Sequence, residues 1–430
     1  MRASRGSDAR PTRSGGGAKR RPRAVAVVAA GALVLAALVA GQARAAGSRS
    51  LFAAADGSGS ACTKQQPCTL SKAIAVAPAG SVVHVGAGTY SGGYVIAKKL
   101  QLLGQGRVVI DASSSSDGTG IHIVGPGGSG SVVQGLIVEK ATFEGILVGT
   151  SPGAAKPQPA PVSNVTIRND WVLSNNQGRG RPGATGECKA APPVPADCGG
   201  GIHLVWASNT TVEHNIVAYN SDGILLTDEY GPTANNTVRN NRIVDNYHEC
   251  GVVLAGHSPK AVGADGKLTD QAGVHDNVVE NNVVRYNGIL ESGAGVLIGG
   301  GAPGSAVYDN VVRGNTIDHN GHSGVTVHQH VAGYLGGNRI LNNTIGVGNT
   351  IGDDDFAAAQ DMQTTGILVA SGSPPGASLP PPLLPSPIPG TVITGNTISD
   401  DAVGIWTLNA PGDFSQNTFG SNVQTRVSAH

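Results

Sequence analysis

Short apolar runs that each begin with glycine recur along the chain and have the length of a buried β-strand. They read GIHI, GILV, GIHL, GILL, GVVL, GVLI, GVTV, GILV and GIWT, and they begin at Gly120, Gly145, Gly201, Gly223, Gly251, Gly295, Gly324, Gly366 and Gly404. A second phrase alternates with them, in which apolar residues flank an asparagine. Its asparagines are Asn215, Asn241, Asn282, Asn315, Asn343 and Asn396. The alternation predicts short strands separated by turns, where asparagine tolerates left-handed backbone.

One pair of phrases is too short to bury its own apolar face, so successive coils must stack and share a core. Stacking places each asparagine over the next, as in an amide ladder. The chain has 64 Gly and 25 Pro among 430 residues, and each Gly weakens a helix by about 1 kcal/mol. We therefore predict an all-β solenoid and exclude a helical bundle.

The phrases resemble the repeats of the right-handed parallel β-helix, the fold of pectate lyases, polygalacturonases and many secreted bacterial proteins, over residues 80–425. The segment Asp56–Tyr90 resembles the amino-terminal cap of that class, with a short helix near Leu70–Ala77. We expect residues 46–90 to form the cap and the first strands, and residues 91–425 the β-helix.

Insertions interrupt the repeat at 150–163, 176–200, 256–275, 349–365 and 372–389. Long loops on one side of a solenoid often wall a binding groove. Surface decoration without function is the alternative.

Residues 1–45 have the layout of an export signal, with a basic stretch, an apolar run over Ala24–Ala40 and small residues at Ala43 and Ala45. A twin-arginine signal and an uncleaved membrane anchor are the alternatives. Cleavage after Ala45 would leave 20 basic and 28 acidic residues. We expect a secreted or surface-anchored protein, with membrane contact only through this segment, and the negative charge disfavours nucleic acid as a partner.

Five cysteines in an exported chain indicate disulfides. Cys62 and Cys68 lie close together in a turn-like stretch, and Cys188 and Cys198 bracket a proline-rich insertion, so we pair each locally. Cys250 is left over, and its place before an apolar strand favours a buried thiol over a reactive one.

Polar side chains form a first column just before the repeat glycines: Asp222, His248, Glu249, Glu291 and His322. The column resembles the polygalacturonase layout, which implies Asp222 as general acid, Glu249 as the base that activates water, and His322 as a group that orients substrate. Paired carboxylates of this kind hydrolyse glycosidic bonds. The family's RIK phrase is missing and the histidine comes one coil late. An Asx turn is the alternative for Asp222.

A second column follows the strands: Asp228, Glu229, His257, His328 and His330. Histidines beside carboxylates are candidates for acid–base catalysis, sugar binding or a metal site. The two columns lie at opposite strand ends, ~20 Å apart, so we expect one short substrate to meet only one of them. Of the two columns, we favour the one that follows the strands as the functional site.

Two further groups are candidates for binding. Asp353 and Asp355 belong to an acidic run that could hold a structural calcium ion, the one cofactor considered, with a solvated loop as the alternative. Trp206 and Trp406 could stack on sugar rings, or simply pack; Glu291 is a further candidate for contact with substrate.

These features favour a secreted carbohydrate-active enzyme, a glycoside hydrolase acting on a neutral or weakly charged polysaccharide or cell-surface glycan. Beyond residue 200 the only lysines are Lys260 and Lys267, which disfavours a lyase that neutralises an acidic sugar with lysine. A lyase or epimerase using Tyr247 or a histidine stays open, as does a non-catalytic glycan-binding scaffold. The sequence leaves the oligomeric state open.

Overall fold

The structure is a computed structural model that describes residues 49–430 apart from 153, 155, 157–158, 180–187, 189–197, 292, 349, 351–363 and 374–378. The expected export signal and the acidic run with Asp353 and Asp355 lie outside the described residues. Within the described part, no helix combines the length and hydropathy needed to cross a membrane.

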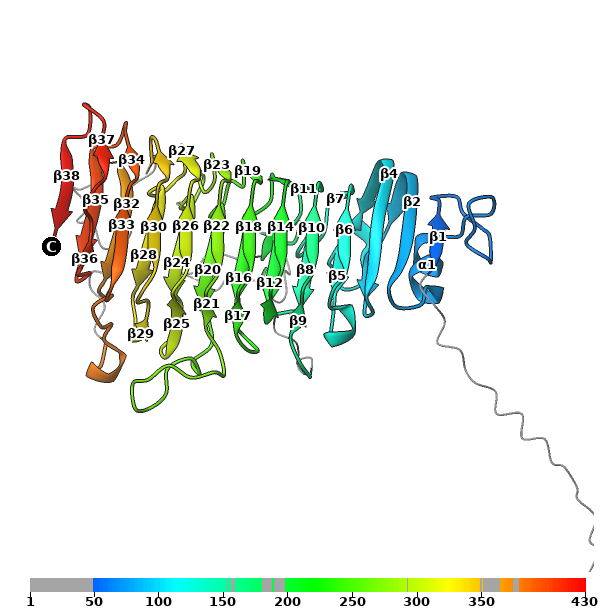
Figure 1. The fold of residues 1–430 in the computed structure, drawn as a ribbon, viewed down its shortest axis with the longest axis horizontal. Coiled ribbons are helices and arrows are strands. Elements are labelled where there is room, and N and C mark those ends of the chain that lie inside the picture. Colours follow the sequence, from blue (N-terminus) through cyan, green and yellow to red (C-terminus); the bar gives the residue numbers. More distant parts are fainter. Residues whose placement is uncertain are drawn as a thin grey trace, which may run out of the picture. The chain divides into compact units, whose positions relative to one another are not determined.

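The chain from residue 49 onward folds as a parallel β-helix, in which each strand pairs with the equivalent strand of the next coil (Figure 1). One sheet has 11 strands and carries the glycine-initiated runs. Its strands are β3 (Tyr94–Ile96), β5 (Ile121–Ile123), β8 (Ile146–Gly149), β12 (Gly200–Val205), β16 (Asp222–Thr227), β20 (Val252–Gly256), β24 (Val296–Gly300), β28 (Val325–Gln329), β32 (Thr365–Ser371), β35 (Val403–Leu408) and β38 (Thr425–Ala429). We call it the groove sheet.

The asparagine phrases form a larger sheet in two columns. The first column contains β1 (Ser50–Ala53), β2 (Ser81–Ser91), β4 (Leu100–Asp111), β6 (Val132–Gln134), β10 (Thr166–Arg168), β14 (Thr211–Glu213), β18 (Thr237–Arg239), β22 (Val278–Glu280), β26 (Val311–Arg313), β30 (Arg339–Leu341), β33 (Thr391–Thr394) and β36 (Gly412–Asp413). The second contains β7 (Ile137–Glu139), β11 (Trp171–Leu173), β15 (Ile216–Ala218), β19 (Arg242–Val244), β23 (Val283–Arg285), β27 (Thr316–Asp318), β31 (Thr344–Ile345), β34 (Thr397–Ile398) and β37 (Thr418–Phe419).

A short third sheet completes each middle coil. It consists of β9 (Val162–Ser163), β13 (Ala207–Ser208), β17 (Thr233–Ala234), β21 (Val274–His275), β25 (Ser305–Tyr308) and β29 (Gly333–Tyr334). The core lies between the sheets because alternate strand residues point inward. Ile224 and Leu226 of β16 stack in register on Val252 and Leu254 of β20, and all four are fully buried.

The expected asparagine ladder is confirmed. The side-chain Nδ2 of Asn215 donates to Oδ1 of Asn241 at 3.0 Å, and the same bond links Asn241 to Asn282. It continues through Asn315, Asn343 and Asn396. Two further ladders that the sequence analysis did not identify occupy the other corners of the coil, one along Asn220, Asn246, Asn287 and Asn320 and one along Asn236, Asn277, Asn310 and Asn338.

The helix expected near Leu70–Ala77 is α1 (Leu70–Val76), which begins after the N-cap Thr69 and packs against β1 and β2. In the described part of the chain, short 3-10 turns lie at Ala112–Ser114, Pro126–Gly128 and Pro381–Leu383. Both expected disulfides, Cys62–Cys68 and Cys188–Cys198, are present. Cys250 is buried, and its Sγ accepts a hydrogen bond from the Ala294 N–H.

Candidate active site

A groove of about 230 Å³ lies on the outer face of the groove sheet. Its floor is made by the outward-pointing residues of neighbouring strands, which alternate with the core residues. Leu225, Val253 and Leu297 stand in one row across β16, β20 and β24, and Ala255 and Gly299 stand in the next. The floor of the groove therefore consists of small and apolar residues. The polar side chains that line the groove lie at the two ends of the strands.

Members of both expected polar columns line this one groove. Asp222 and Glu249 lie at the starts of the strands, and His257, His328 and His330 lie at their ends. The expectation of two separate sites is therefore replaced by one groove, and an extended polymer that follows the strands could contact both ends.

Glu229 and His257 form a hydrogen-bonded pair at the rim of the groove, which His257 lines. Glu229 follows β16 and His257 follows β20, so the pairing of these strands brings them together. Nδ1 of His257 lies 2.7 Å from Oε1 of Glu229, and Thr227 Oγ1 donates to Oε2 of Glu229 at 2.6 Å. Burial acts to raise the pKa of Glu229, but His257, His203 and Thr227 outweigh it and lower the pKa to about 2. Glu229 is therefore an anion at neutral pH.

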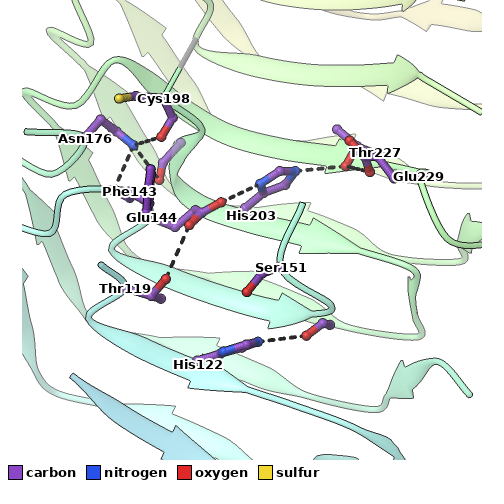
Figure 2. Close-up of polar contacts among 12 residues, drawn as sticks. Thr119, His122, Phe143, Glu144, Ser151, Asn176, Cys198, His203, Thr227 and Glu229 are labelled. Carbon is purple, nitrogen blue, oxygen red and sulfur yellow. Dashed lines mark hydrogen bonds and ion pairs between the residues drawn. The ribbon is translucent and has the colours of Figure 1, made fainter. Parts of the chain in front are cut away.

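A buried chain of hydrogen bonds extends from Glu229 into the protein (Figure 2). Nε2 of His203 lies 2.9 Å from Thr227 Oγ1, and Nδ1 of His203 lies 3.2 Å from Oε1 of Glu144. Thr119 donates to the other oxygen of Glu144 at 3.4 Å. His203 and Glu144 are each only 3% exposed at their side chains.

The sequence analysis did not identify His203, Thr227 or Glu144. A signal for His203 was present, because GIHL carries a histidine at the outward position where GILL has leucine.

Asp228 is a structural anchor. Its Oδ1 accepts the backbone N–H groups of His257 at 2.6 Å and Ser258 at 3.0 Å, and its Oδ2 accepts that of Gly273 at 2.8 Å. Asp228 is fully buried, and burial raises its pKa. It ties both ends of the long loop between β20 and β21 and holds His257 in place, so its part in the site is positioning.

His328 and His330 stand on β28 and just after it. Their rings meet edge to face with centroids 4.8 Å apart. Between β20 and β28 runs β24, where Gly299 and the glycine after the strand, Gly301, leave room for imidazoles on both sides. A Cβ at Gly301 would lie 3.2 Å from the His257 ring, and a Cβ at Gly299 would lie 3.4 Å from the His328 ring. Glycines on β24 and directly after it therefore separate His257 from His328.

At the other end of the groove Arg179, from the insertion at 176–200, holds Glu249 and Glu291. The sequence analysis predicted this insertion but did not single out Arg179. Its guanidinium binds both carboxylate oxygens of Glu291 and lies 3.5 Å from Glu249. Its Nη1 and Glu291 Oε1 each lie 3.1 Å from Nδ1 of His248. The hydrogen bond with Arg179 lowers the pKa of Glu291.

Asp222 is only 3% exposed, and its Oδ1 accepts the N–H of Cys250 at 2.8 Å. The bond has the character of a turn anchor, which was the alternative to general acid. His322 is half-buried, and its backbone N–H donates to Gly293 O. It is not among the described residues that line the groove.

The two candidate tryptophans, Trp206 and Trp406, differ in accessibility. Trp206 lines a hollow of about 420 Å³ with Glu229, Tyr230, Lys260 and Asp270, directly beside the Glu229–His257 pair. Trp406 is 7% exposed and stacks on His430 with ring centroids 4.9 Å apart. Packing therefore accounts for Trp406, while Trp206 offers an open aromatic face.

Comparison with known proteins identifies the fold. Residues 187–312 match the profile of a family described as periplasmic copper-binding protein (NosD). No curated protein sequence matches the chain significantly. Among solved structures, the A-module of mannuronan C-5 epimerase AlgE4 from Azotobacter vinelandii is similar with a TM-score of 0.51 and 18% identity, over 89% of this chain and 99% of that module.

The A-module of the epimerase AlgE6 from the same organism gives a TM-score of 0.51 at 18% identity, over 87% of this chain and 92% of that one. Pectate lyase Pel9A gives 0.45 at 17% identity, over 86% and 78%. The likeness to the two epimerase modules shows that the chain shares their parallel β-helix fold.

Proposed function

We propose that this chain is an exported polysaccharide lyase or epimerase, in which His257 removes a proton from a uronate residue. The observation that carries the proposal is the hydrogen bond between an ionised Glu229 and His257 at the rim of the groove. An imidazole held by a carboxylate is a base suited to neutral pH. His257 has 40% of its side chain exposed, so it is accessible to a bound polymer.

The reaction follows from the acidity of the sugar carbon beside a carboxylate group. His257 takes the proton from that carbon, and the electrons of the broken C–H bond move into the ring–carboxylate system. In a lyase they then form a ring double bond and expel the glycosidic oxygen, which takes up a proton. In an epimerase a proton returns to the opposite face of the same carbon. His328, across the glycines of β24, is the group proposed to supply that proton.

The carboxylates of the groove are poorly suited to glycoside hydrolysis, which the sequence alone favoured. That reaction needs a protonated carboxyl as acid and a second carboxylate as base or nucleophile. Glu229 is held ionised, Asp228 is sealed by backbone N–H groups, and Glu249 lies beside Arg179. We therefore favour histidine-based proton abstraction.

The hollow beside Glu229 supports a uronate as the substrate. Trp206 and Tyr230 offer aromatic faces on which a sugar ring can stack, and Lys260 offers a cation for its carboxylate. The two disulfides support an oxidising compartment outside the cytoplasm.

Copper has no part in the proposal. Among the described residues, no group of three or more His, Cys, Asp or Glu side chains is arranged to hold a metal ion. His257, His328 and His330 share one groove without forming such a group.

The test is deuterium exchange at the sugar carbon. The purified protein is incubated in D₂O with a panel of uronate-containing polysaccharides, and the products are followed by NMR and ultraviolet absorbance. Deuterium without cleavage identifies an epimerase, and an absorbing unsaturated product identifies a lyase. Whichever product is found should disappear in the His257→Gln variant. It should persist in the control variant His214→Gln, which changes an exposed histidine directly after β14. Reducing ends without unsaturation, or binding with no reaction, would overturn the proposal.

A further inference from the structure

A chain of hydrogen bonds connects Glu144 to His257. The single hydroxyl proton of Thr227 determines which groups in the middle of this chain donate and which accept. Thr227 has a single O–H, and it donates that proton to Glu229, whose carboxylate can only accept. The Thr227 oxygen must then accept from Nε2 of His203, 2.9 Å away. His203 therefore carries a proton on Nε2.

The same reasoning fixes the protons at both ends of the chain. Nδ1 of His203 and Oε1 of Glu144, 3.2 Å apart, share one proton, either as imidazolium and carboxylate or as imidazole and carboxylic acid. At the other end, the ionised Glu229 can only accept, so Nδ1 of His257 carries a proton. In a neutral His257 ring, Nε2 is then the basic nitrogen.

We propose that Thr227 and His203 are positioning residues that act through Glu229, holding its carboxylate so that His257 carries its proton on Nδ1 and uses Nε2 as the base. Glu144 holds His203 in turn. This inference rests on the proposed function, in which His257 is the catalytic base.

Packing alone does not account for these polar side chains. His203 stands in the row where Leu147 and Leu225 occupy the neighbouring strands, and Thr227 stands in register with Val205 and Ala255. On the adjacent coils, apolar residues therefore fill the positions equivalent to His203 and Thr227. Burying His203 and Glu144 instead costs desolvation, which the connected hydrogen bonds offset. The network runs from Glu144 through His203 of β12 and Thr227 of β16 to Glu229 (Figure 2).

The first test measures the His257 tautomer, a quantity that does not depend on turnover. Long-range ¹⁵N–¹H spectra of the labelled protein distinguish Nδ1–H from Nε2–H imidazole, and the His257→Gln variant identifies the signal. We expect His257 in the Nδ1–H form in the unaltered protein. A neutral His257 protonated on Nε2 would overturn the inference even in a fully active enzyme.

The second test uses matched variants. Thr227→Val removes the hydroxyl at nearly constant shape, whereas Thr227→Ser keeps it. We expect Thr227→Val to mix the His257 tautomers and lower kcat about tenfold, the scale of one hydrogen bond to a charged group, while Thr227→Ser keeps both properties. His203→Phe should change the tautomer in the same direction, and circular dichroism with thermal melts identifies folded variants.

An unchanged tautomer in a folded Thr227→Val would overturn the inference and leave the proposed function intact. An Nδ1–H signal in a protein that exchanges no deuterium would instead contradict the proposed function while supporting the positioning role.

Discussion

Asp228 and Glu229 are adjacent carboxylates whose surroundings move their pKa values in opposite directions. Asp228 points into a cage of backbone N–H groups where burial raises its pKa, and Glu229 points to His257 and Thr227, which lower its pKa to about 2. Repeat offsets alone placed both residues in one candidate column. They could not separate the two roles, because the separation depends on which side of the loop each side chain faces.

The low pKa of Glu229 predicts a pH-dependent contribution to stability. A carboxyl with a lowered folded-state pKa stabilises the fold above its unfolded pKa, and this contribution is lost as the pH falls through the folded value. Glu229→Gln should therefore unfold at lower urea concentration than the unaltered protein at pH 7. The difference should shrink between about pH 4.5 and pH 2. A difference that stays constant over this range would contradict the ion pair with His257.

Removing the Asp228 carboxylate should release the loop between β20 and β21. Asp228→Ala leaves three backbone N–H groups without their acceptor, and the loss costs about 1–3 kcal/mol for each of the two that are buried. We expect limited proteolysis within residues 257–273 to become faster, together with loss of activity because His257 moves. Asp265→Ala changes an exposed carboxylate of the same loop and should leave the cleavage rate unchanged.

At the scale of elements, each coil is held by its strands and by asparagines at the corners. The sequence predicted one ladder because its asparagines lie between β-branched residues. The ladder along Asn220 was missed because aromatic and acidic residues surround its asparagines in the sequence, and the ladder along Asn236 was missed because no apolar β-branched residue stands three positions before Asn236. Arg179 and the hollow at Trp206 were beyond prediction for another reason, since both depend on how insertions fold back over the coils.

A ladder asparagine should contribute far more than its neighbour at the turn. Asn241→Ala removes the acceptor of both the backbone N–H and the side chain of Asn215, and the donor to Val212 O. We expect a loss of about 3 kcal/mol in the free energy of unfolding, measured with urea. Asn240→Gly is the matched control, because Asn240 has φ of 55° and a conformation that glycine adopts without strain. Equal losses in both variants would contradict the ladder's role.

At the scale of the whole molecule, repeats predicted the solenoid correctly because every coil obeys the same pattern. The two ends of the solenoid do not follow this repeat pattern. At the amino-terminal end, the Cys62–Cys68 loop is bonded to β1 and to the residue after it. Phe52 of β1 donates its N–H to Cys62 O at 2.8 Å, and Ala54 donates its N–H to Cys68 O at 3.0 Å. In a solenoid each coil contacts mainly its neighbours, so weakening one end loosens that end first.

Replacing Cys62 and Cys68 together by serine should therefore act locally. The chain-entropy model gives about 2 kcal/mol for so short a loop. We expect faster hydrogen exchange at the β1 amides and unchanged exchange at β16. The double serine variant of Cys188 and Cys198 provides the comparison and should leave β1 protected. Faster exchange spread evenly over all coils would show that the solenoid opens as one cooperative unit.

The ladder through Asn241 also gives the molecule a direction. Each side-chain amide donates toward the next coil and accepts from the preceding one, so all the amide dipoles in the column align head to tail. Asp170 lies at the amino-terminal end and Asn417 at the carboxy-terminal end. The two ends are therefore chemically unlike, and two copies placed with like ends together would set opposed dipoles against each other. Added coils can continue the column in only one orientation, so this protein has a built-in polarity, as a filament does.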